Sequence, residues 1–100
     1  MIYMQPLRIG EHTFIGVEVK LPKTTLISVS NDKGYIMCGA LDVDLLNRKL
    51  KDRRIVAGRA VGVRSIDDLL EAPLESVTEE AEQYGIHKGM IGRDALLKMV

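Results

Sequence analysis

The sequence predicts an α+β fold: N-terminal antiparallel strands and hairpins, then a strand–helix–strand unit, then C-terminal short helices packing on a mixed sheet. Residues 1–41 form short alternating or apolar runs separated by turn residues, and residues 65–100 carry helix caps and helical spacing. We expect residues 1–100 to form a single domain, with 1–22 as a β oligomerisation region and 23–100 as the α+β core.

A β-hairpin is expected at the N-terminus. Ile2 to Ile9 predicts the first strand, and Pro6 restricts it to a sheet edge or a bulge. Gly10-Glu11 suits a two-residue type II′ turn, because glycine tolerates the positive φ of its first central position. The second strand, Thr13 to Leu21, alternates like a half-buried strand and ends at Pro22.

Two further strands follow the hairpin. Thr24 to Ser30 alternates apolar and polar residues, and the turn-forming run Asn31 to Gly34 closes it. Tyr35 to Leu41 is apolar on both faces, which is typical of a central strand covered on both sides.

A strand–helix–strand unit comes next. Asp42 is a good N-cap for a helix from Val43 to Asp52. Ile55 to Val63 predicts a fifth strand, parallel to Tyr35 to Leu41 and reached by a right-handed crossover.

The rest of the chain predicts three short helices. Ser65 caps the first, Ile66 to Glu71, which stops before a proline. Ser76 with Glu79 forms a capping box for Val77 to Tyr84, and a last helix covers Ile91 to Met99.

Composition limits the location and the partners. No apolar run approaches the roughly 18 residues of a membrane span, and Met1 to Leu7 lacks the pattern of a secretory signal. A lone cysteine forms no internal disulfide, so we expect a cytoplasmic protein with no membrane partner. The net charge is zero, although residues 1–64 carry +5 and residues 65–100 carry −5. That balance gives no support for nucleic-acid binding.

Cys38 is the candidate catalytic nucleophile. It lies at the end of an apolar strand just before a helix cap, where a thiol can be activated. The alternative is an inert core thiol, since free cysteine is often buried. His12 and His87 are far apart in the sequence and belong to no ligand cluster, so we expect no metal site.

Arg59, Gly39 and Asp42 are the candidate ligand-binding residues. Arg59 has apolar neighbours two positions away on either side, so its guanidinium needs a partner. It is either a structural ion pair or an anion anchor. Gly39 and Asp42 stand where a strand end meets a helix start, a favoured place for ligands in sheets with crossover helices.

Several runs together resemble a known family. They are GYIMCGALDVDLLNRKL (34–50), IVAGRAVGVRSIDDLL (55–70), APLESVTEEAEQYGI (72–86), GMIGRDALL (89–97) and LPKT (21–24). In that order they are similar to the YunC-like family of small bacterial and archaeal proteins of unknown function. The resemblance implies an N-terminal β region that mediates tetramerisation. It implies no established activity, ligand or catalytic residue.

Two functional hypotheses therefore remain. The first is a homo-oligomeric binding or interaction module, a homotetramer without a cofactor and without recognisable catalytic residues. The alternative is a small enzyme or small-ligand-binding protein with a site around Cys38 to Asp42.

Overall fold

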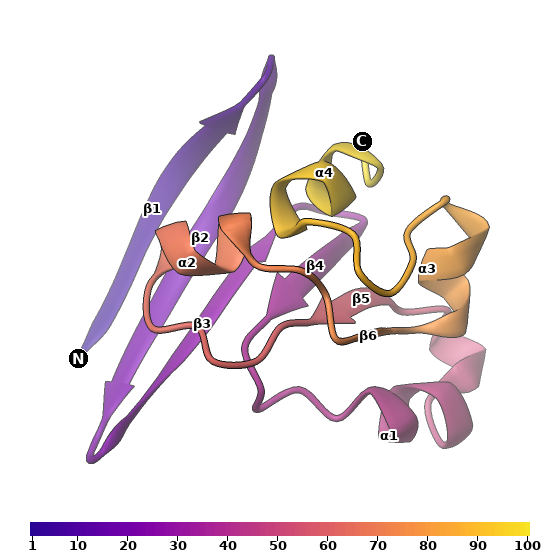
Figure 1. Cartoon of the computed structure of the whole chain (residues 1–100), viewed down its shortest axis with the longest axis horizontal. Helices are drawn as coiled ribbons and strands as arrows, with labels where there is room; N and C mark the ends of the chain where they lie inside the picture. Colours follow the sequence, from indigo (N-terminus) through magenta and orange to yellow (C-terminus); the bar gives the residue numbers. More distant parts are fainter.

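The computed structural model describes residues 1–100 and contains one six-stranded sheet with the strand order β1-β2-β3-β4-β5-β6 (Figure 1). The strands are β1 (Ile2–Ile9), β2 (His12–Leu21), β3 (Thr24–Ser30), β4 (Gly34–Met37), β5 (Val56–Arg59) and β6 (Ser76–Val77). All neighbours are antiparallel except β4 and β5, which are parallel. The predicted α+β class and the parallel pair are therefore confirmed.

Short helices connect and cover the sheet. They are α1 (Val43–Arg48), a 3₁₀ turn η1 (Lys51–Arg53), α2 (Ile66–Glu71), α3 (Glu79–Gln83) and α4 (Gly92–Leu97). Each α-helix has only five or six residues, so none of them could traverse a bilayer.

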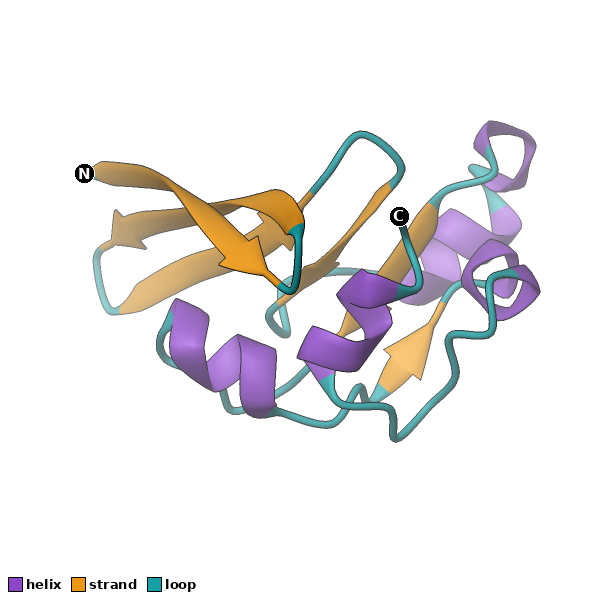
Figure 2. Ribbon diagram, turned by 90° about the horizontal axis from the view of Figure 1, so that it is seen from above, coloured by secondary structure: helices purple, strands orange, loops and turns teal.

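One face of the sheet packs on α2 and α4 along most of its width. Figure 2 shows these two helices on a single side of the strands. Phe14, Ile27 and Val29 from β2 and β3 and Ile36 from β4 are fully buried there, together with Leu69 and Leu96 from the helices. This cluster is the main hydrophobic core.

The opposite face is covered only over the C-terminal strands. Ala57 of β5 points to this face, because the register pairs it with Tyr35 rather than with the core residue Ile36. Ala57 is fully buried, and both α1 and α3 contact β5. No helix covers this face over β1 and β2 (Figure 2).

The N-terminal hairpins match the predictions closely. The turn Gly10-Glu11 joins β1 and β2, Gly10 has φ +62°, and Glu11 keeps a negative φ, which fits the predicted type II′ turn. Pro6 does lie on an edge strand. Capping of α1 by Asp42 and of α2 by Ser65 is also confirmed, because each side chain accepts a backbone N–H three residues on.

Two strands were predicted too long. β4 ends at Met37 rather than Leu41, because a turn closed by the bond from Leu41 N to Cys38 O interrupts it. β5 ends at Arg59 rather than Val63, and Gly62 adopts φ +75°. Apolar residues continue past both ends, and hydropathy alone does not show where a strand loses its pairing partner.

The boundaries of three helices were also wrong. The helix predicted over Val43 to Asp52 ends at Arg48, and residues 51–54 are all exposed, so a longer helix would have no face to bury. Ser76 pairs with Arg59 in β6 instead of starting a helix, and Thr78 is the N-cap of α3. The last helix is shorter than predicted, since Ile91 is its N-cap.

Candidate functional site

A pocket of about 440 Å³ lies where the parallel strands β4 and β5 end, and we call it the strand-end pocket. It is lined by the segment 39–44 together with Arg59, Glu75 and Ser76. The structure thus brings three of the four sequence-predicted site residues together: Gly39, Asp42 and Arg59. The carboxyl ends of parallel strands commonly hold ligands, because the loops that follow them meet at one edge.

Arg59 is the central side chain of this pocket, and it is already engaged. Its Nε and Nη2 donate to Gly39 O at 3.2 and 3.1 Å, and its Nη1 donates to Glu75 Oε2. The guanidinium therefore links the loop after β4 to the segment before β6. A guanidinium has five N–H donors, so two remain for other partners.

Acidic and hydroxyl groups complete the pocket. Asp42 Oδ1 accepts from Leu45 N at 3.0 Å as the α1 cap, and Asp44 lies in the first turn of α1. Ser76 Oγ donates to Glu75 Oε2 at 3.4 Å. Three carboxylates face one guanidinium, so this pocket carries net negative charge.

Cys38 does not line the strand-end pocket. Cys38 is 6% exposed and belongs to the main hydrophobic core. Its backbone N–H donates to Ile27 O at 3.0 Å, and its thiol forms no hydrogen bond with a histidine or a carboxylate. A nucleophile needs an activating neighbour of that kind, and this arrangement supplies none.

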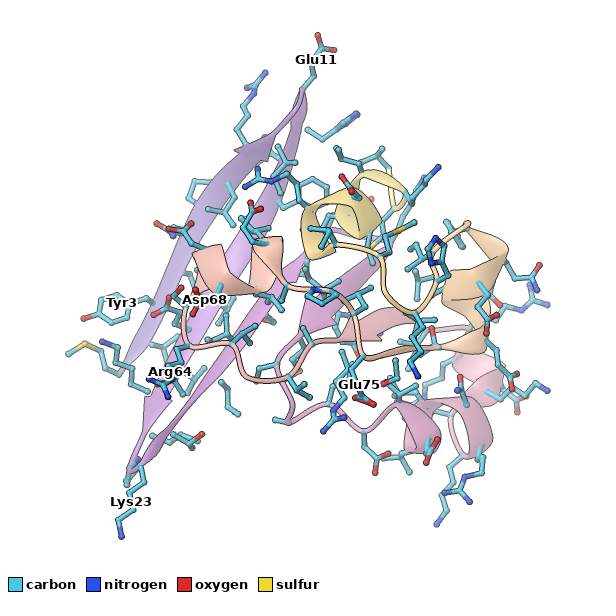
Figure 3. All side chains as sticks on the ribbon, viewed as in Figure 1. Tyr3, Glu11, Lys23, Arg64, Asp68 and Glu75 are labelled. Atoms are coloured by element: carbon cyan, nitrogen blue, oxygen red, sulfur yellow. The ribbon has the colours of Figure 1, made fainter.

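Glu75 is the pocket residue that sequence reasoning missed. It follows the loop after α2, 16 positions beyond Arg59, and no periodic pattern links the two. Two signals pointed toward it. Arg59 required a partner, and the C-terminal third of the chain carries an excess of acidic residues. Figure 3 shows Glu75 projecting below the end of the sheet.

A second feature is the uncovered side of the N-terminal hairpin. We call it the outer sheet face, and it consists of Ile2, Met4, Pro6, Ile15, Val17, Val19 and Leu21. Ile2 is 66% exposed and Met4 is 69% exposed, whereas Phe14 on the other side of the same hairpin is fully buried. Exposed apolar side chains that adjoin one another mark interaction surfaces more often than chance.

The outer sheet face carries almost no charge. Within β1, β2 and β3, the register places only one charged side chain in these rows, Arg8 near the β1–β2 turn. The charged residues Glu18 and Lys20 of β2 point to the helix side instead, with Tyr3. A partner could therefore bury this face without stranding a charge.

The free edge of β1 is less suited to pairing. Met1 and Lys20 exchange backbone hydrogen bonds, and bonded pairs alternate along the hairpin. The Pro6–Ile15 pair is therefore a non-bonded one, and the outward position of Pro6 has no N–H to offer an added strand. The face of the hairpin is the better contact surface.

Comparison with known proteins identifies a family to which the chain is similar. The model of "Domain of unknown function (DUF1805)" matches residues 37–99. The chain is 65% identical over 100 residues to the uncharacterized protein YunC of Bacillus subtilis (strain 168), spanning 100% of this chain and 99% of that protein.

A solved structure has the same fold. It is a protein of unknown function from Thermoplasma acidophilum, TA1206, which shares 29% sequence identity with this chain. The TM-score is 0.89, and the match covers 100% of this chain and 94% of the other. Both relatives are described as uncharacterized or of unknown function. They support the fold of this chain and assign no chemistry to it.

Proposed function

This chain belongs to the DUF1805 family, and we propose that it works as a homo-oligomeric binding module in the cytoplasm, assembled through its outer sheet face. The observation that carries the proposal is the uncharged, exposed apolar surface on β1 and β2. The resemblance to YunC-like proteins favours four copies, and a second copy of the chain is therefore the occupant that we propose.

Symmetry supports a second copy as the occupant. In a two-fold contact the same patch meets itself, so a charged patch would place like charges together. The outer sheet face avoids this problem along the rows formed by Ile2, Met4 and their partners on β2. A chain of 100 residues also has a modest core, and an interface that buries more apolar area would supplement it.

Light scattering after size exclusion tests the assembly. We expect a mass of four times the 11.1 kDa chain, which falls toward that of one chain only at high dilution. A mass of one chain at micromolar concentration would rule out the proposal. A stable dimer would keep the outer sheet face as an interface and would correct the number of copies.

The strand-end pocket supports a second candidate function, small-ligand binding. The two remaining Arg59 N–H donors and its position at the ends of parallel strands favour this reading. An Arg59→Gln variant is expected to lose such binding. Nucleophilic catalysis by Cys38 has less support, and alkylation should occur only on unfolding, because the thiol is buried. Fast alkylation of the folded protein would instead support Cys38 as a catalytic nucleophile.

A further inference from the structure

We infer that a second pocket, at the tip of the β2–β3 hairpin, binds the phosphoryl group of a small ligand. This hairpin pocket has a volume of about 500 Å³. Lys20, Lys23, Thr24 and Thr25 come from the hairpin, and Arg64 comes from the loop between β5 and α2. In Figure 3, Lys23 extends from the lower tip of the β2–β3 hairpin, and Arg64 lies above it, beside Asp68.

The hairpin pocket concentrates positive charge. None of its lining residues is acidic, and none of its three cations takes part in any ion pair of the structure. Two carboxylates lie beside the pocket. Asp68 accepts from the backbone N–H of Arg64 at 3.1 Å, and Glu18, which lines a neighbouring hollow with Lys20, accepts from Ile66 N at 3.4 Å. Neither forms an ion pair with the three cations, and three cations around one hollow favour an anion.

Backbone strain at Lys23 is an independent observation. Pro22 and Lys23 are the two central residues of the β2–β3 turn, and Lys23 has φ +65°. Proline at the first central position with positive φ at the second describes a type II turn, where glycine is the favoured second residue. A lysine there keeps the backbone in a costly region, and such outliers gather at functional sites.

The lining residues favour a compact phosphoryl group. Arg64 has the planar fork that matches phosphate oxygens, the two lysines supply point charges, and threonine hydroxyls can donate further hydrogen bonds. The pocket falls within the size range of small-molecule sites. No aromatic residue lines it, so bases of a nucleic acid would have no stacking surface.

Titration with inorganic phosphate, followed by amide NMR shifts, tests the inference on the intact chain. The ionic strength is held constant with sodium chloride, so that general screening does not change. We expect saturable shifts centred on residues 23–25 and 64. Shifts spread over all exposed cations, or none at all, would overturn the inference.

Variants distinguish a built site from surface charge. Arg64→Gln and Lys23→Gly should each weaken phosphate binding roughly 10- to 100-fold, the range expected for a charge-assisted hydrogen bond. Lys33→Gln, in the β3–β4 turn, removes the same charge elsewhere and should leave binding unchanged. Equal weakening by all three would contradict the site.

Lys23→Gly also separates binding from folding. Glycine relieves the positive φ, so this variant should be at least as stable as the parent to urea while binding less phosphate. Loss of both stability and binding would mean that Lys23 has a structural role, and would overturn its part in the site.

The source of the phosphoryl group is resolved by competing ligands. Glucose 6-phosphate binding more tightly than inorganic phosphate at the same residues would identify an organic phosphomonoester as the ligand class. Equal affinities would assign the pocket to the free ion. Tighter binding of a ten-nucleotide single-stranded DNA, with shifts extending beyond the hairpin, would replace the small ligand by a nucleic acid.

Discussion

The C-terminal part of the sheet, β4 and β5, and the N-terminal part, β1 and β2, differ in how much of their two faces is covered. Over β4 and β5, one face is buried near α4, and the other is buried on β5 near α1 and α3 and half-buried on β4. Over β1 and β2, one face is buried against the core and the outer sheet face is left apolar and exposed. Every helix of the chain comes after residue 42. The N-terminal strands therefore have helices from later in the chain for one face only.

The difference shows which part of the chain's apolar surface is covered by its own helices and which part is left exposed. The DUF1805 match starts at Met37, so it covers the helix-rich part and leaves β1 to β3 outside. Alternation in β2 puts Phe14 on the side that meets the chain's own helices and most of the strand's apolar side chains on the outer sheet face. An exposed apolar surface of this kind is the feature on which the proposed assembly rests.

Ile36→Ala should lower the free energy of unfolding by roughly 2 to 5 kcal/mol, because it opens a cavity in a fully buried site. Ile2→Ala, on the outer sheet face, should change it by less than about 0.5 kcal/mol in dilute protein. Urea denaturation at two protein concentrations measures both. Equal losses for the two variants in dilute protein would mean that the two regions are buried alike.

Thr78→Val should cost about 1 to 3 kcal/mol, because a buried hydroxyl is lost that binds three backbone groups. Thr78 Oγ1 accepts from Ala57 N at 3.1 Å and from Ala81 N at 3.2 Å, and it donates to Ile55 O at 2.7 Å. Thr78→Ser keeps the hydroxyl and should recover most of the loss. A valine variant as stable as the parent would contradict this role of the hydroxyl, because valine keeps the methyl group of Thr78 and replaces only the hydroxyl.

The comparison also shows what sequence can and cannot predict here. Asp42 and Ser65 were predicted correctly as caps, since a capping side chain and the backbone N–H that donates to it lie within four residues. Thr78 was missed because two of its three partners, Ala57 on β5 and Ile55 just before it, lie more than twenty residues away. Its own position three residues before Ala81 was hidden by the more obvious pair Ser76 and Glu79.

The residues of the strand-end pocket also differ in whether local sequence predicts them. Gly39, Asp42 and Arg59 were predicted, because a strand end beside a helix cap is visible locally. Glu75 depends on how the chain returns to the sheet as β6, a strand of only two residues. So short a strand leaves no periodic signal, since alternation needs at least four residues to be recognised.

Arg59→Gln should lower stability by less than about 1 kcal/mol, because both partners of its ion pair are partly exposed and screened. Glu75→Gln should have a similar effect, and the double variant should lose little more than either alone. Denaturation of the three variants completes this cycle. A loss of several kcal/mol would make Arg59 part of the core, and would remove the contrast between the pocket and Ile36.

Tyr35 should make stability depend on pH at the alkaline end. Desolvation by burial raises its pKa above the ordinary 10.0, so the folded state holds the proton more tightly than the unfolded state. Its contribution is complete below pH 10.0 and is lost as the pH rises through the folded pKa. Tyr35→Phe should flatten urea midpoints between about pH 9 and 11. An unchanged slope would assign the dependence to other groups.

Sedimentation equilibrium on charge variants tests the central claim most directly. Met4→Lys combined with Ile15→Lys places two charges on the outer sheet face, where both residues are exposed, so the fold of each chain should survive. We predict a mass of no more than two chains for this variant, and the parent mass for the control Tyr84→Lys, which alters an exposed residue at the end of α3. An unchanged oligomer in the double variant would contradict assembly through the outer sheet face.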